Sequence, residues 1–145
     1  MSKVISIDPG KSKCGLVLAE ISEQKVYKAI VLKSEILDDY VMDLNSVEDI
    51  SKIIIGNGTT SCEIREKLEF LKKEIITFEE KNTTYRAKQR YFELFPISGL
   101  KFLIPREIFI LNKNLDAISA LIILEDYCKI KFNLDQNIDF KTWLK

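Results

Sequence analysis

Residues 4–18 have the sequence VISIDPGKSKCGLVL, which indicates a strand, a tight turn and a second strand. The first half is rich in β-branched apolar residues, as a buried strand requires. Asp8 follows this strand directly, Pro9-Gly10 turns the chain, and Gly15 lets the returning strand pass close to a neighbour. A carboxylate at a strand end can hold a hard cation or steer a phosphate, but Asp8 can also simply cap the turn.

The length and composition of the chain indicate one globular domain. The chain has 145 residues, and 46% of them are hydrophobic, which is enough for a core and too many for a disordered protein. No apolar run approaches the roughly 18 residues that a membrane span needs. The N-terminus also lacks the basic segment and apolar stretch of a signal peptide. We therefore expect a cytoplasmic protein that makes no membrane contact.

The residue types in the chain limit the chemistry that it can perform. It contains no histidine, which excludes a Ser-His-Asp triad, histidine-based acid–base catalysis and the usual zinc sites. Its three cysteines, Cys14, Cys62 and Cys128, are far apart in the sequence, so we expect reduced and buried thiols. A metal in this protein would be held by oxygen atoms, which favours Mg²⁺ or Mn²⁺.

The rest of the chain alternates between strand and helix patterns. Three strands are expected first, the third over residues 26–32, and they form an antiparallel meander. Ser34 is the expected N-cap of the first helix. Strands over 52–56 and 74–80 then alternate with amphipathic helices, and a buried apolar helix starts near Asn114. This order predicts an α/β fold with a five-stranded mixed sheet and helices on both faces.

Charges of one sign are clustered in the sequence, although the formal net charge is +0. Residues 34–50 carry only negative charges, and residues 81–106 carry mainly positive ones. The acidic residues are Glu35, Asp38, Asp39, Asp43, Glu48 and Asp49. The basic residues are Lys81, Arg86, Lys88, Arg90, Lys101 and Arg106, opposed by Glu93. Each run can be a solvated helix face, or the two runs can give the molecule one acidic and one basic face.

Three acids stand where this topology can bring them together. Asp8 ends the first strand, Glu80 ends the fifth, and Asp116 opens the last helix. If the fourth strand lies between the first and the fifth, the carboxyl ends of parallel strands meet at one edge, where open α/β sheets place their sites. Three carboxylates there repel one another unless a cation lies between them, and paired divalent ions favour phosphoryl chemistry. Taken singly, Glu80 can be a solvated strand end and Asp116 an acid that the helix dipole favours.

Three segments resemble the YqgF (RuvX) family, relatives of the RuvC Holliday-junction resolvases with an RNase H-like fold. Residues 7–15 resemble the opening Asp-x-Gly motif of the family, and their Asp-Pro-Gly sequence is closer to that of RuvC itself. Residues 78–87 resemble its Asp-Glu-Arg-x-[Ser/Thr]-Thr-x-x-Ala segment, and residues 115–127 resemble its last helix. The order and the spacing of these segments agree over roughly residues 3–129.

The resemblance implies a metal-dependent nuclease that hydrolyses phosphodiester bonds of structured nucleic acid and takes part in precursor ribosomal RNA processing. Its catalytic acids and ligands of Mg²⁺ or Mn²⁺ would be Asp8, Glu80 and Asp116, with Asp8 shared by two ions. The nuclease domain would span residues 1–130, followed by a C-terminal tail over 131–145, which we expect to pack on the surface. Phosphate contacts, which would position nucleic acid without reading its sequence, are expected from Lys11, Lys13, Lys81, Arg86 and Arg90.

Some positions depart from the family pattern and keep other functions open. Glu79 and Lys81 stand where the family usually has Asp and Arg, and Lys is not equivalent to Arg in a bidentate phosphate contact. The fourth acid of RuvC would fall near Ser119 and is missing, whereas the Asp-Pro-Gly turn favours a Holliday-junction resolvase of RuvC type. The other alternative is a catalytically inactive nucleic-acid-binding module. We expect at most a weak homodimer, formed through Tyr91, Phe92 and Phe95.

Overall fold

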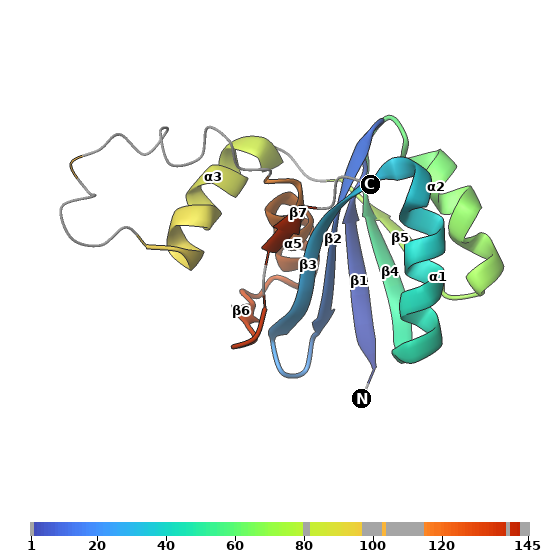
Figure 1. The fold of residues 1–145 in the computed structure, drawn as a ribbon, viewed down its shortest axis with the longest axis horizontal. Coiled ribbons are helices and arrows are strands. Elements are labelled where there is room, and N and C mark those ends of the chain that lie inside the picture. The colour runs from blue at the N-terminus through green and yellow to red at the C-terminus, as the bar shows by residue number, and fades with distance from the viewer. Residues whose placement is uncertain (1, 80–81, 97–102, 104–114, 139, 143–145) are drawn as a thin grey trace.

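Figure 1 shows the fold in a computed structural model, which describes residues 2–79, 82–96, 103, 115–138 and 140–142. The strands are β1 (Lys3–Asp8), β2 (Lys13–Glu20), β3 (Lys25–Lys33), β4 (Ile50–Gly56), β5 (Glu74–Phe78), β6 (Asn133–Leu134) and β7 (Phe140–Thr142). The helices are α1 (Leu37–Val47), α2 (Ser61–Leu68), α3 (Thr83–Leu94) and α5 (Asp116–Cys128). Short 3₁₀ turns follow β3 at Ser34–Ile36 and α2 at Glu69–Leu71.

All of these strands belong to one sheet with the order β5-β4-β1-β2-β3-β6, and β7 also pairs with β3. The strands β1, β2 and β3 are antiparallel neighbours, whereas β4 is parallel to both β1 and β5. This mixed order confirms the predicted α/β fold and is that of the RNase H-like class. The described sheet has seven strands rather than the five expected, because two short C-terminal strands pair in parallel with β3.

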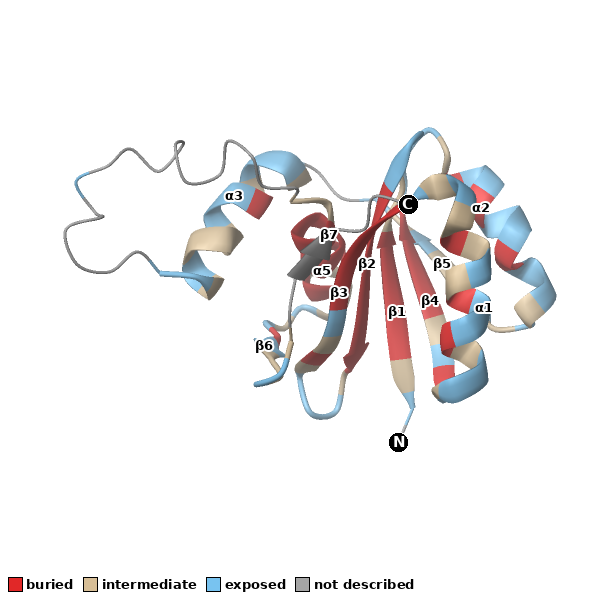
Figure 2. Cartoon of the chain, in the orientation of Figure 1, coloured by how far each residue is buried: buried red, intermediate tan, exposed pale blue. Residues whose placement is uncertain are grey.

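Helices cover both faces of the sheet, as expected (Figure 1). One face carries α1 and α2, and the other carries α5, with α3 packed on the outer side of α5. Since side chains alternate along a strand, Ile5 and Ile7 of β1 face α1 and α2, while Val4 faces α5. The central strands are buried over most of their length (Figure 2). Each fully buried Ile or Leu contributes about 1.5–3 kcal/mol, so these two apolar layers stabilise the sheet.

Helix α5 is buried on most sides because apolar residues occupy most of its length. All of its residues from Ala117 to Glu125 are buried. The Ser6 hydroxyl in β1 donates a hydrogen bond of 2.7 Å to the carbonyl oxygen of Ala120. Because Ser6 is fully buried, this bond satisfies a polar group that would otherwise destabilise the core. The bond also fixes the position of α5 above the central strand.

Three local features differ from the sequence prediction. Ser34 does not cap the first helix: its hydroxyl donates a 2.7 Å hydrogen bond to the carbonyl oxygen of Gly10 and so connects the β1–β2 turn to the end of β3. Strand β5 ends at Phe78, before the two acids, because its partner strand β4 already ends at Gly56. Phe132, expected on the surface with the tail, is buried against α5, so the chain after α5 is anchored in the core.

The cysteines are free thiols with different exposure. Cys14 is buried, as expected, but Cys62 is exposed on α2 and Cys128 is partly buried. The prediction that all three are buried was therefore wrong for Cys62. Within the described ranges, the structure contains no helix with the length and apolar character that a membrane crossing requires.

Candidate catalytic site at the end of strand β1

Asp8 is the last residue of β1, a central strand, and lies where the carboxyl ends of the parallel strands meet. Its strand lies between β2 and β4, and the parallel strands β1, β4 and β5 all end at this edge. Alternation along the strand places Asp8 on the same face as Ser6, whose hydroxyl binds the backbone of α5. The carboxyl ends of parallel strands are where open α/β sheets bind ligands, so Asp8 occupies a favourable place for a site.

Gly15 brings Asp8 and Asp116 to the same point of the fold. It lies directly opposite Asp8 in the β1–β2 ladder. The N-terminus of α5 packs against the same glycine: a Cβ atom at Gly15 would lie 1.8 Å from the carbonyl oxygen of Asp116 and 2.2 Å from its carbonyl carbon. Only a residue without a side chain allows this approach. The two acids are therefore neighbours through Gly15, although they are far apart in the sequence.

The side chain of Asp116 is partly shielded from solvent. Its side chain is half-buried, and this burial raises the pKa of the carboxyl group, whereas the Lys13 ammonium opposes the rise. Asp116 also opens α5, where the helix dipole favours a negative charge. Burial therefore makes ionisation of Asp116 costly, and a cation placed beside the carboxylate would offset that cost.

The turn after β1 packs against the loop after β4. A Cβ atom at Gly58 would lie 3.2 Å from Cγ of Pro9, and one at Gly56 would lie 3.4 Å from Cδ of the same proline. The backbone N–H groups of Asn57 and Gly58 donate to the carbonyl oxygens of Phe78 and Gly56. This loop therefore supports the turn that carries Asp8, and those two N–H groups are already bound within the protein.

The predicted third acid, Glu80, and the predicted phosphate contact Lys81 lie outside the described residues. Glu79 is described, and it is exposed immediately after β5. Among the residues that the structure describes, no three acidic or cysteine side chains are grouped so that they could hold a metal ion. The described part of the site therefore consists of Asp8 and Asp116, and the contribution of Glu80 stays a prediction.

The two described carboxylates fit a hard divalent cation. Mg²⁺ and Mn²⁺ prefer oxygen ligands, and Mg²⁺ is usually bound by one or two carboxylates together with waters and substrate phosphates. Asp8 and Asp116 offer such oxygens, and the partial burial of Asp116 favours a cation at its side. The donor atoms are therefore compatible with the metal that the resemblance implies.

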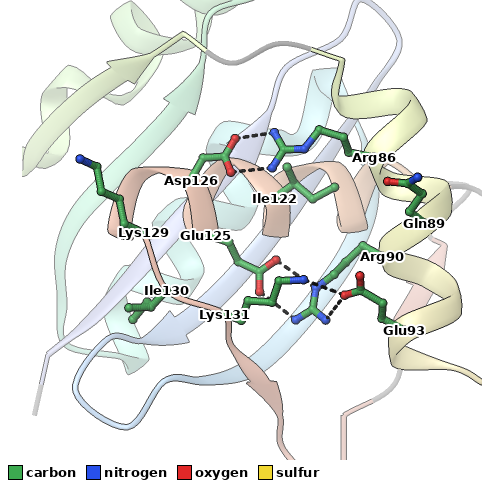
Figure 3. A pocket seen from close by; sticks show the side chains of 10 residues that line it. All are labelled: Arg86, Gln89, Arg90, Glu93, Ile122, Glu125, Asp126, Lys129, Ile130 and Lys131. Atoms are coloured by element: carbon green, nitrogen blue, oxygen red, sulfur yellow. Dashed lines mark hydrogen bonds and ion pairs between the residues drawn. The ribbon is translucent and has the colours of Figure 1, made fainter.

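Two predicted phosphate contacts, Arg86 and Arg90, form ion pairs between α3 and α5 (Figure 3). Arg86 donates two hydrogen bonds of 2.6 Å to Asp126. Arg90 donates two to Glu125, at 3.0 and 2.8 Å, and its side chain is only 11% exposed. Both carboxylates belong to the C-terminal part of α5, whereas Asp116 is at its N-terminus. These pairs link α3 to α5, and a phosphate would have to compete with them, so phosphate binding by the two arginines stays a prediction.

The pocket in Figure 3 lies between α3 and α5 and has a volume of about 400 Å³. Its lining residues are Arg86, Gln89, Arg90, Glu93, Ile122, Glu125, Asp126, Lys129, Ile130 and Lys131. Acids and bases of the lining pair with one another across it, and neither Asp8 nor Asp116 is among them. The pocket is therefore separate from the candidate site.

The remaining predicted phosphate contacts, Lys11 and Lys13, are exposed, Lys11 in the β1–β2 turn and Lys13 at the start of β2. Lys13 begins β2 and is close enough to Asp116 to influence the pKa of that residue. Strand pairing adds Lys33, which stands directly opposite Lys13 at the end of β3. Lys33 was missed in the sequence because only the register of β2 and β3 places it there.

Replacing Gly15 by alanine is expected to separate α5 from the sheet at the site. The added methyl group would meet backbone atoms of Asp116 rather than a movable side chain. Overpacking of this kind costs about 1–3 kcal/mol, and we expect at least that loss in the free energy of unfolding. Urea denaturation measures it, with Gly58→Ala as the control because its new Cβ would meet only Pro9, at 3.2 Å. Equal stability of the two variants would contradict the packing described for Gly15.

No protein-family model matches the sequence, and neither does any curated protein. Among solved structures, the chain is similar to T. thermophilus RuvC in complex with a Holliday junction substrate, with a TM-score of 0.48 and 11% identity over 89% of this chain and 96% of that chain. It is similar to the human cytomegalovirus terminase nuclease domain, Mn soaked and inhibitor bound, with a TM-score of 0.48 and 14% identity over 87% of this chain and 82% of that chain.

A third similar structure is a ROK family glucokinase from Streptomyces griseus in complex with glucose and AMPPNP. It has a TM-score of 0.41 and 11% identity, over 62% of this chain and 37% of that chain. At such TM-scores and identities, none of these similarities assigns a family or an activity to this chain. The fold assignment rests on the strand order and directions instead.

Proposed function

We propose that this protein is a divalent-metal-dependent nuclease that hydrolyses phosphodiester bonds of structured nucleic acid. The observation that carries the proposal is the convergence of Asp8 and Asp116 on Gly15, at the carboxyl end of the central strand. These are the first and last acids of the motifs that resemble the YqgF family. The RNase H-like strand order supports the same proposal, because it supplies the sheet edge at which such acids meet.

Each residue of the candidate site has a definite part in this proposal. Asp8 and Asp116 hold Mg²⁺ or Mn²⁺ with their carboxylate oxygens, and Glu80 completes the set of ligands. Gly15 keeps the two described acids together, and the packing of Pro9 fixes the turn that follows Asp8. Lys11 and Lys13 bind phosphates without reading the base sequence. A bound divalent ion supplies Lewis-acid stabilisation of phosphoryl oxygens and increases the acidity of water.

Structured RNA is the first substrate that we propose, with precursor ribosomal RNA as the natural source, because the motif near residues 78–87 resembles YqgF in particular. A branched DNA junction is the second candidate, because the sequence Asp8-Pro9-Gly10 is closer to the RuvC motif. Both substrates present closely spaced phosphates to the same acids, so the site chemistry alone favours neither.

The test compares cleavage of a precursor ribosomal RNA fragment and of a four-way DNA junction, each with Mg²⁺, with Mn²⁺ and with a chelator. Cleavage that requires the divalent ion is the expected result, and the preferred substrate decides between the two candidates. A wild-type protein that binds both substrates but cuts neither would exclude the nuclease and support the third candidate, an inactive binding module.

A further inference from the structure

Lys13 and Lys33 form an unusual like-charge pair at the exposed ends of β2 and β3. The two residues stand directly opposite each other in the antiparallel ladder. Directly opposite side chains project from the same face, with Cβ atoms about 4.5–5.5 Å apart, and like charges in this arrangement are destabilising. Both lysines are exposed, and neither forms an ion pair with any residue that the structure describes.

This lysine pair lies beside the acidic site on the same face of the sheet. Lys13 precedes Gly15 by two residues, so its side chain projects to the face on which Gly15 meets α5. Lys33 shares that face with Val31, which packs in the layer beneath α5. One step of two residues along β2, about 7 Å, separates the lysine pair from Gly15. A chain of phosphates passing over the two acids would therefore also pass over the lysines.

The distribution of acidic residues favours the face that carries α5 as the binding surface for a polyanion. The acidic run of the sequence begins with Glu35 in the 3₁₀ turn and continues with Asp38, Asp39 and Asp43 on helix α1. Helix α1 packs on the opposite face of the sheet from α5. A polyanion is therefore repelled from the α1 face and would approach Lys13 and Lys33 from the α5 face.

We propose that Lys13 and Lys33, assisted by Lys11 in the adjoining turn, bind the phosphodiester backbone of a nucleic acid next to the site of Asp8 and Asp116. The bound phosphate removes the repulsion between the two lysines, which the free protein tolerates at a cost in stability. This inference rests on the proposed function only for the kind of partner, a nucleic acid; it requires no cleavage.

The test measures binding of a labelled RNA hairpin and a labelled four-way DNA junction by fluorescence anisotropy, in a chelator and over a series of salt concentrations. Lys33→Ala is expected to weaken binding of both probes several-fold. It should lower the salt dependence, the slope of log K against log salt, by about 0.7–0.9, the value for one phosphate contact. Lys13→Ala/Lys33→Ala is expected to lower the slope about twice as much.

Lys28→Ala is the matched control, because Lys28 is an exposed lysine of the same strand. Its side chain lies 6.0 Å from the ring of Tyr40 in α1, on the other face of the sheet. The control should bind both probes as the wild type does. Any of three results would overturn the proposal. Lys28→Ala and Lys33→Ala could lose affinity equally, Lys33→Ala could bind as the wild type does, or the wild type could fail to bind at low salt.

A second measurement separates a binding role from a purely structural one. Lys33→Glu places opposite charges across the β2–β3 ladder, so its melting temperature is expected to rise while its nucleic-acid affinity falls. A fall in both quantities would mean that Lys33 stabilises the fold, and would overturn the proposal. If the wild type binds through the lysines but cuts neither substrate, the nuclease proposal fails and this inference stands.

Discussion

Replacement of Asp8 by asparagine is expected to reduce metal-dependent cleavage by more than about 10²–10³-fold. That range is the cost of removing one preorganised charge-stabilising group from an active site. Asp8 is expected to exceed it, because the resemblance gives it a position shared by two ions. The substitution keeps the size of the side chain and one carbonyl oxygen but removes the negative charge. Initial rates with Mg²⁺, on whichever substrate the wild type cuts, measure the effect.

Thermal melting gives a second readout that does not depend on activity. A ligand that binds only the native state raises the melting temperature, so millimolar Mn²⁺ is expected to stabilise the wild type. Asp8→Asn is expected to lose that response while keeping a folded structure, because Asp8 is only partly buried at the end of its strand. A wild-type melting curve that Mn²⁺ does not move would count against the metal site.

Glu79→Gln is the matched control for the acids of the site. Glu79 is exposed just after β5 and has no assigned part in the reaction, so its loss should change the rate only mildly. Glu80→Gln, by contrast, is expected to abolish the proposed cleavage. If Glu79→Gln is inactive and Glu80→Gln is active, the assignment of the third acid is wrong. If Asp8→Asn cleaves at the wild-type rate, the whole site is wrong.

Much of the fold could be predicted because local patterns and topology rules agree. The apolar strands around residues 4–18 and 52–56 are short and β-branched, and parallel pairing of strands that alternate with helices puts their carboxyl ends together. The observed neighbours β1, β4 and β5 follow that expectation. The position of Asp8 at the sheet edge could therefore be inferred from sequence before any distance was known.

The partners of charged side chains could not be predicted in the same way. The sequence shows Arg86 and Arg90 in a basic run, but not that α3 crosses α5 so that Asp126 and Glu125 face them. Lys33 gave no signal by itself, since its meaning depends on the register that sets it opposite Lys13. Such pairings depend on tertiary contacts between segments that are distant in the chain, and composition and periodicity carry no information about them.

Arg90→Met is expected to lower the free energy of unfolding by about 3–5 kcal/mol, the usual cost of removing one partner of a buried ion pair. The side chains of Arg90 and Glu125 are only 11% and 8% exposed. Arg90 also donates a 2.9 Å hydrogen bond to the carbonyl oxygen of Phe132, so its loss leaves several buried groups without a partner. Urea denaturation with linear extrapolation measures the change.

Arg86→Met is the comparison, because Arg86 occupies the same helix and also forms a bidentate pair. Its side chain is 40% exposed and that of Asp126 is 29% exposed, so solvent screens the pair and the expected loss is at most about 1 kcal/mol. Similar losses for the two arginine variants would contradict the view that burial makes the Arg90 pair the stronger link between α3 and α5.

A double variant distinguishes two effects on stability: that of the buried charge of Glu125, and that of the hydrogen bond between Glu125 and the chain after α5. The backbone N–H of Phe132 donates a 2.8 Å hydrogen bond to Glu125, and glutamine can still accept it. In Arg90→Met, the carboxylate of Glu125 stays buried without its cation, whereas Arg90→Met/Glu125→Gln removes that charge and keeps the acceptor. The double variant is therefore expected to be more stable than Arg90→Met alone, a coupling that a double-mutant cycle detects. Simple addition of the two single losses would show that packing, rather than an unpaired buried charge, determines the cost of losing Arg90.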